Sequence, residues 1–303
     1  MDKAFINFKY IDAIVRAGSI RRAAEALSIT PSALNRRLIS IEDELEVQIF
    51  ERLPRGVRLN AAGEILIQHI RTQLSDFERI KSQIADLSGF RRGEVTIACS
   101  QALLPFFLPE QIDRYRTEHP RIQVCVLPRD RSSAEAALAD FTADLAIVFE
   151  PIKMSDFHPI ITVRQEILAV MDRSHPLARK TKLRLHDCLE YPLALPTKAY
   201  GVRWLFDQAI AKLNQSILPS LESDSFEFLR MAVSNTDLIT LQIEVGLAAN
   251  ETEKSVISRP IASSDIATGL LHFGHLRGRV LSVAAAKFAT QLAQVLSKRY
   301  QSV

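Results

Sequence analysis

The apolar positions at the start of the chain recur at the spacing of amphipathic helices. Phe8, Ile11 and Val15 predict a first helix that ends at Gly18. Ser19 is a favourable N-cap for a second helix. The inward positions of that helix are Ile20, Ala23, Ala24 and Leu27. Its two small alanines allow another helix to cross closely, so the pattern predicts two helices in contact.

A third helix follows after a short break. Thr30 is its predicted N-cap and Pro31 its first residue, where proline is favourable. The predicted buried positions again have helical spacing: Leu34, Leu38, Ile41 and Leu45. Two short helices joined by a tight turn, the second with polar residues outside, predict a helix-turn-helix.

The outward face of this third helix carries side chains that suit DNA recognition. Because the leucines face inward, Ser32, Asn35 and Arg36 face out, at the helix end that enters a major groove in this motif. An arginine here can fork to guanine O6 and N7, and Asn35 or Ser32 suits a base edge or a phosphate. Arg37 is predicted to contact a phosphate. The helix alone leaves an alternative open, a capped surface helix with solvated polar residues.

A short hairpin is predicted next. Residues 50–52 and 57–59 alternate in polarity around Leu-Pro-Arg-Gly at 53–56, a sequence that suits a turn. Beside a helix-turn-helix, such a hairpin is a wing. Its Arg55 and Arg58 are then placed to touch the sugar-phosphate backbone.

Charge within residues 1–63 is unevenly distributed. Ten Lys/Arg against eight Asp/Glu make the segment barely basic, and the acids cluster at residues 42–46, at the far end of the third helix. The bases lie instead in the elements that would face double-stranded DNA, the predicted partner. The predicted DNA-contacting residues are Arg22, Thr30, Ser32, Asn35, Arg36, Arg37, Arg55 and Arg58.

Residues 23–63 resemble the LysR-type transcriptional regulators. They carry the family's Ala-Ala pair, its Thr-Pro-Ser-Ala start of the third helix, Arg36 and its Gly-Val-Arg-Leu wing. Glu46 departs from the usual glycine, which should alter only a helix end, and Asn35 departs from the common serine, which can change the bases read. The resemblance implies a homodimeric or homotetrameric regulator that binds an imperfect inverted repeat in promoters and responds to a small-molecule effector.

A long helix is predicted from the N-cap Asn60 to about Ser88. Its a and d positions in one heptad frame are Leu66, Ile70, Phe77, Ile80, Ile84 and Leu87, with Gln73 as the polar interruption. Such a seam predicts a homodimer through this linker helix, and a two-fold pair of winged helices can read a palindrome. The alternative is a single amphipathic helix packed on its own domain. Residues 88–93 then break the helix and form a hinge.

From Glu94 the pattern alternates between strands and helices. The predicted strands are Val95–Cys99, Ile122–Leu127, Leu145–Phe149, Ile167–Met171, Leu193–Leu195 and Leu238–Leu241. The alternation predicts an α/β fold with mostly parallel sheets. The resemblance, looser here, implies a periplasmic-binding-protein-like effector domain of two Rossmann-like subdomains.

Three parts of the chain follow from these patterns. Residues 1–63 are expected to form the winged helix-turn-helix DNA-binding domain, residues 60–93 the linker helix and hinge, and residues 94–303 the effector-binding domain. Within the last part, the family template assigns residues 94–163 and 267–303 to subdomain I and residues 164–266 to subdomain II.

Ligands of open α/β sheets bind at the carboxyl ends of the strands. Ser100, Gln101 and Ala102 follow the first strand, Phe149 ends the third, and Pro196 and Thr197 end a strand of the second subdomain; these are the predicted effector contacts, together with Arg129. Arg129 can pair with a carboxylate on the effector, although solvated arginines are common. Residues 233–240 lack the family's glycine, so no contact is carried over there.

Composition narrows the remaining classes. The chain has 303 residues, 47% of them hydrophobic, and a formal charge of +3. No apolar run reaches the ~18 residues of a membrane span, and the N-terminus lacks the apolar stretch of a signal peptide, so a cytoplasmic protein without a membrane partner is expected. Three cysteines without ligand spacing predict no metal and no cofactor.

Three alternatives to a regulator remain. An enzyme is not expected, because no nucleophile elbow, P-loop or dinucleotide fingerprint occurs and no catalytic residues are assigned. A free-standing solute-binding protein would fit the C-terminal half alone. A thiol redox sensor would use Cys99 beside the predicted cleft, while Cys125 is expected to pack as a small hydrophobe.

Overall fold

The computed structural model describes residues 3–87, 93–153, 155–247 and 255–303. It divides into one compact unit that ends at Ile84 and a second that begins at Ala85. Each unit has its own buried apolar cluster and is described by itself.

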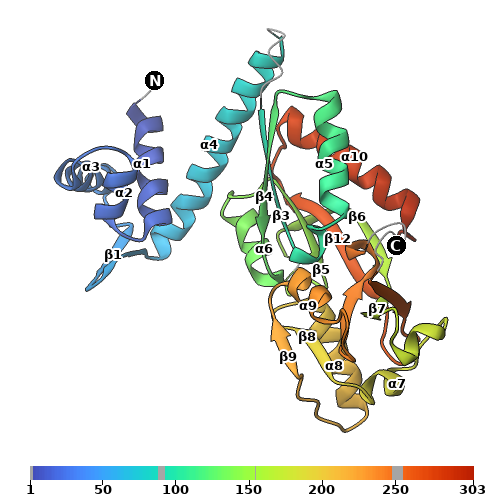
Figure 1. Ribbon diagram of the computed structural model, residues 1–303. Helices are drawn as coiled ribbons and strands as arrows, with labels where there is room; N and C mark the ends of the chain where they lie inside the picture. The colour runs from blue at the N-terminus through green and yellow to red at the C-terminus, as the bar shows by residue number, and fades with distance from the viewer. Residues whose placement is uncertain (1–2, 88–92, 154, 248–254) are drawn as a thin grey trace. The chain divides into compact units, whose positions relative to one another are not determined.

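The first unit is a winged helix-turn-helix continued by a long helix. Its elements are α1 (Lys3–Ala17), α2 (Ile20–Ala26), α3 (Pro31–Glu44), β1 (Phe50–Leu53), β2 (Gly56–Leu59) and α4 (Ala61–Leu87), as Figure 1 shows. The core gathers residues from each of the helices and from the start of the wing, among them Ile14, Ala24, Leu34, Phe50 and Ile70. The predicted helix-turn-helix and wing are confirmed.

The turn between α2 and α3 is a Schellman motif. Ser28 has a φ of +56°, its N–H donates to the Glu25 carbonyl at 3.1 Å, and the Ile29 N–H donates to the Ala24 carbonyl at 3.0 Å. These bonds satisfy the last carbonyls of α2 while the chain reverses. The prediction for Leu45 is wrong, because α3 ends at Glu44 and the Leu45 side chain is 44% exposed at the C-cap.

The second unit contains two five-stranded sheets. Subdomain I holds β3 (Gly93–Cys99), η1 (Gln101–Leu103), α5 (Phe107–Glu118), β4 (Ile122–Pro128), α6 (Arg131–Ala139), β5 (Leu145–Phe149), β6 (Phe157–Gln165), β12 (Gly269–Leu276) and α10 (Val283–Arg299). Its strand order is β4-β3-β5-β12-β6. Side chains of α5 and α10 cover one face of this sheet, and α6 covers the other (Figure 1).

Subdomain II is built on the same plan. Its elements are β7 (Ile167–Asp172), η2 (Pro176–Arg179), α7 (Leu185–Leu189), β8 (Leu193–Pro196), α8 (Gly201–Lys212), β9 (Leu221–Ser223), α9 (Phe226–Ala232), β10 (Ile239–Ile243), η3 (Glu244–Gly246) and β11 (Val256–Pro260). Its strand order is β11-β7-β10-β8-β9. The expected pair of Rossmann-like subdomains is confirmed.

The sheets are mostly parallel, as expected, because four of the five strands in each run in the same direction and one strand is reversed. In subdomain I, β3 runs parallel to β4 and β5, but β12 runs antiparallel to β5 and β6. In subdomain II, β7 likewise runs antiparallel to β10 and β11. The reversed strands β7 and β12 are those that receive the chain from the other sheet. The chain passes directly from β6 into β7, and later returns through β12, which lies between β5 and β6.

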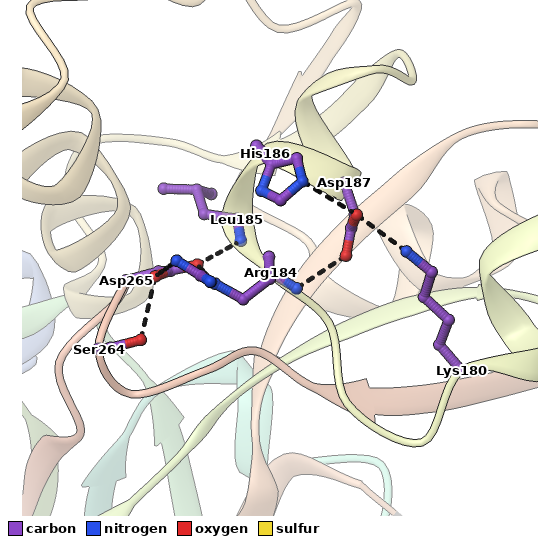
Figure 2. Close-up of polar contacts among 7 residues, drawn as sticks. All are labelled: Lys180, Arg184, Leu185, His186, Asp187, Ser264 and Asp265. Atoms are coloured by element: carbon purple, nitrogen blue, oxygen red, sulfur yellow. Dashed lines mark hydrogen bonds and ion pairs between the residues drawn. The ribbon is translucent and has the colours of Figure 1, made fainter.

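The chain therefore crosses between the sheets twice. The first crossing is at Glu166, between β6 and β7, and the second lies between Pro260 and Gly269. Figure 2 shows how the second segment is anchored to subdomain II: Arg184 Nε and Nη2 donate to the Asp265 carboxylate at 2.7 and 2.9 Å. The Leu185 N–H donates to the same carboxylate at 2.9 Å, and these contacts hold the pKa of Asp265 well below its usual range.

Candidate functional site

The exposed face of α3 carries the predicted DNA-reading residues. The Thr30 hydroxyl accepts from the Ala33 N–H at 3.2 Å, so this side chain caps the helix. Ser32 and Arg36 are exposed and Asn35 is half-buried, while the leucines between them pack in the core. The cap and the buried stripe thus fix which polar residues project outward.

The wing contributes an arginine that the sequence analysis did not select. Arg52 of β1 donates from Nη2 to Asn35 Oδ1 at 3.3 Å, which joins the wing to the recognition face of α3. Its position in a short alternating strand was visible, but its neighbour on α3 depends on the tertiary packing. Of the predicted wing residues, Arg55 is exposed at the tip, and Arg58 Nε pairs with Glu51 at 2.8 Å across the hairpin.

The start of β2, next to the tip of the wing, is fixed against the turn after α1. The Val57 N–H donates to the Gly18 carbonyl at 3.1 Å. Gly56 has a φ of +135°, and a Cβ there would lie 2.3 Å from the Gly18 oxygen. Only glycine fits this close approach. Arg22, on the first turn of α2 beyond this contact, is exposed.

Arg37 has a different surrounding from the other predicted DNA contacts. It is half-buried, and its Nε donates to Asn7 Oδ1 at 2.7 Å, so its guanidinium is tied to α1. Asn7 itself is only 7% exposed. The contact orients α3 against α1.

The linker helix α4 belongs partly to the DNA-binding unit. Ile67 and Ile70 are buried in its core, and Arg71 Nε pairs with Asp12 of α1 at 3.0 Å in a nearly buried contact. Further along, Ile80 is 45% and Ile84 58% exposed. The predicted heptad seam is therefore divided: its first turns pack on the chain itself, and later positions are uncovered. The Leu87 side chain lies outside the described residues.

A second site lies between the two subdomains of the effector-binding unit. It is a narrow pocket with a cavity volume of about 20 Å³ in the arrangement seen here. Four of the predicted effector residues line it, namely Ser100, Ala102, Arg129 and Phe149. The other lining residues are Asp130, Arg131, Ala134, Ile147, Val148, Tyr200, Gly201, Val202, Phe226 and Ile243.

Gln101, Pro196 and Thr197 do not line this cleft. Gln101 begins η1 and is half-buried outside the lining. Pro196 is buried, and its carbonyl accepts from Arg203 Nη1 at 3.1 Å. The Thr197 hydroxyl donates to Asp224 Oδ1. The chain then continues to Tyr200 and Gly201, which take the place facing subdomain I.

Sequence reasoning missed several polar lining residues. Asp130 caps α6 by accepting from the Ser133 N–H at 2.8 Å; burial opposes ionisation, but bonds from Ser133 and Ser132 leave its pKa below the usual value. Arg131 follows it as the first residue of α6. Both follow β4, as Ser100 follows β3, so the rule of the strand carboxyl ends could have found them.

The far wall of the cleft is aromatic. Tyr200 and Phe226 pack edge to face, with ring centroids 5.1 Å apart. Burial, with Asp224 and Asp130 nearby, raises the pKa of Tyr200 to about 12, so its hydroxyl is neutral at physiological pH. Together with Arg129 on the opposite wall, these rings offer an apolar surface and a cation to one small molecule.

The cysteines lack the setting of reactive thiols. Cys99 and Cys188 are buried, and burial raises the pKa of each thiol to about 12. Cys125 is half-buried in β4. A thiolate is the reactive form, so the proposed sensor Cys99 is held in the unreactive state.

The described residues contain no group of three or more His, Cys, Asp or Glu arranged to hold a metal ion. Within the same residues, no helix combines the length and hydropathy needed to cross a membrane.

Comparisons with known proteins match both units. Residues 6–64 match the family described as bacterial regulatory helix-turn-helix protein, lysR family, and residues 88–297 match the LysR substrate binding domain. An uncharacterized HTH-type transcriptional regulator, YbhD of Escherichia coli strain K12, is 30% identical over 200 residues, which span 65% of this chain and 62% of that protein.

Solved structures share the fold. A full-length cysteine variant of OxyR from Pseudomonas aeruginosa has a TM-score of 0.68 at 17% identity, covering 98% of this chain and 94% of that one. Full-length CbnR, solved in complex with its target DNA, has a TM-score of 0.59 at 18% identity, covering 97% and 99%. At these identities the likeness is one of fold.

Proposed function

The chain belongs to the LysR family of bacterial helix-turn-helix transcriptional regulators, and from this premise we propose which of its residues read DNA and what its cleft binds. The family match assigns DNA binding to the N-terminal unit and effector binding to the C-terminal unit. The observation that carries the residue assignment is the outward face of a capped, core-anchored α3, on which Ser32 and Arg36 are exposed and Asn35 is half-buried.

We infer that Arg36 reads a base and that Arg22, Arg52, Arg55 and Arg58 bind phosphates. Arg36 is exposed on the outer face of α3 and makes no ion pair with the other described residues, so its guanidinium can meet guanine O6 and N7. The wing arginines lie on a hairpin beside that helix, which suits contacts to the sugar-phosphate backbone. Arg37 orients α3 through Asn7 and contributes less directly.

Binding measurements on two DNAs test this assignment. One DNA is an operator that the purified full-length protein selects from genomic fragments, and the other is random DNA. Arg36→Ala should weaken binding to that operator by about 1–3 kcal/mol, with little loss on random DNA, because a lost base contact removes sequence discrimination. Arg55→Ala is the matched variant, expected to weaken both DNAs alike. Equal losses on the two DNAs for Arg36→Ala would make it a phosphate contact instead.

The effector, in this proposal, is a small organic anion with an apolar body. Arg129 supplies a cation at the cleft, and Phe149, Tyr200 and Phe226 supply apolar walls. A guanidinium binds a carboxylate through charge-assisted hydrogen bonds, and the rings cover the rest of the molecule.

A thermal-shift screen of small carboxylates, each with its uncharged amide, tests the effector class. A bound carboxylate should raise the melting temperature of the wild type, and its amide should not. Arg129→Gln should weaken the effective carboxylate about tenfold, since a bond to a charged group contributes about 1.5–3 kcal/mol. Equal shifts by an amide and its acid would contradict an anionic effector.

The active assembly is proposed to be a homodimer through α4, and a homotetramer on a promoter site. Exposed Ile80 and Ile84 on the second half of α4 support pairing with another copy. Since its target is chromosomal DNA, we place the protein in the cytoplasm. Its action is binding without turnover, so the effector should be recovered unchanged after incubation, and a product would contradict this.

A further inference from the structure

Two arginines link the subdomains that enclose the cleft. Arg131, the first residue of α6 in subdomain I, lies over the Trp204 ring of α8 in subdomain II, with its Cζ 5.7 Å from the ring centroid. Arg230 of α9 in subdomain II lies over the Phe106 ring of subdomain I, also at 5.7 Å. The contacts are reciprocal, because each subdomain supplies one arginine and one aromatic ring.

Hydrogen bonds hold Arg131 in this position. Its Nη1 donates to the Glu150 carbonyl of subdomain I at 3.0 Å, and its Nε makes a longer contact of 3.4 Å with the Ala199 carbonyl of subdomain II. Glu150 is itself fixed: its φ is +51°, and its carboxylate accepts from the Leu270 N–H at 2.7 Å. The guanidinium is thus held by one subdomain and presented to the other.

Arg230 is oriented in a similar way. Its Nε donates to Glu227, one turn earlier on α9, at 3.0 Å, and its side chain is 19% exposed. The subdomains also touch closely at Gly201 of α8, where an added Cβ would lie 2.6 Å from the Phe149 carbonyl oxygen.

We propose that Arg131 and Arg230 are clasps, which hold the two subdomains in the arrangement seen here by cation–π contacts across the cleft. An effector can shift the arrangement only by binding one state better than another. The clasps therefore set how large that difference in binding free energy must be. This consequence rests on the proposed function, whereas the clasps themselves do not.

The single tryptophan of the chain is Trp204, which makes the first clasp directly observable. In the full-length protein, Arg131→Gln should raise the acrylamide quenching constant of tryptophan fluorescence about twofold. Arg129→Gln is the matched control, since Arg129 lines the same cleft but donates to the carbonyl of its neighbour Pro128 at 2.9 Å. Its quenching constant should equal that of the wild type. A wild-type value for Arg131→Gln would overturn the clasp.

The second clasp is tested by moving the fluorophore. In a chain with Trp204→Phe and Phe106→Trp, Arg230→Gln should raise quenching about twofold, and an unchanged constant would overturn that clasp. Arg131→Lys is a second variant for the first clasp, in case Arg131→Gln does not fold. Lysine keeps the charge but not the planar stacking, so a smaller rise in the quenching constant is expected. Circular dichroism confirms that each variant is folded.

Failure of this proposal is distinguishable from failure of the proposed function. The quenching measurement uses neither DNA nor effector. Unchanged quenching with intact operator binding would remove only the clasps, and altered quenching without operator binding would remove only the regulator assignment.

Discussion

Glu46 occupies the left-handed position that ends the recognition helix. Its φ is +54°, its N–H donates to the Asp43 carbonyl at 3.2 Å, and the Val47 N–H donates to the Glu42 carbonyl at 3.2 Å, which together form a Schellman motif. Glu46 thus adopts the left-handed backbone conformation that suits the glycine usual in the family. Glu46→Gly should stabilise the first unit by up to about 1 kcal/mol, because glycine adopts this conformation without steric cost. Urea unfolding measures it, and an equal gain for Glu46→Ala would assign the effect to charge instead.

At the same scale, residues whose role depends on their own helix were predictable, and residues whose role depends on a tertiary neighbour were not. Thr30 caps α3 as its sequence position indicates. Arg37 and Arg52 read as surface arginines, yet each bonds to a side chain distant in sequence. Pro196 and Thr197 lie at the end of a strand that leads to the cleft. Their polar groups bond instead to Arg203 and Asp224.

Elements with strong periodicity were predictable from the sequence, and short or irregular strands were not. The six predicted strands correspond to β3, β4, β5, β7, β8 and β10. The other four strands described in the second unit were not among them: β6, which contains Pro159; β9, which has three residues; β11, which ends in Pro260; and β12, which contains Gly269 and Gly274. Proline and short length weaken a strand signal because neighbouring strands, rather than the segment itself, supply the hydrogen bonds.

The linker helix gives the prediction that belongs to the element scale. Ile80→Glu should shift the protein from dimer to monomer at micromolar concentration, because it places a charge in the a/d seam of α4. Ile65→Glu is the matched control on the same helix, since Ile65 is 78% exposed and lies outside the seam. Sedimentation velocity measures both. Dimers in both variants would show that another surface pairs the subunits.

For the whole molecule, the essential fact is that the buried apolar residues form separate clusters. Leu34 belongs to a cluster drawn entirely from the first unit, and Phe288 to one drawn entirely from the second. Both side chains are fully buried. Cooperative unfolding follows shared packing, so each unit should unfold as its own transition.

Two truncating substitutions test this separation. Leu34→Ala should destabilise only the first unit by about 2–5 kcal/mol, and Phe288→Ala only the second by about 3–5 kcal/mol, because each leaves a cavity in one core. Differential scanning calorimetry of the full chain should then show one transition moving while the other stays. If either substitution moves both transitions together, the units unfold as one. In that case the DNA-binding unit is stabilised by the effector-binding unit, and an effector that stabilises its cleft would also raise the stability of the recognition helix.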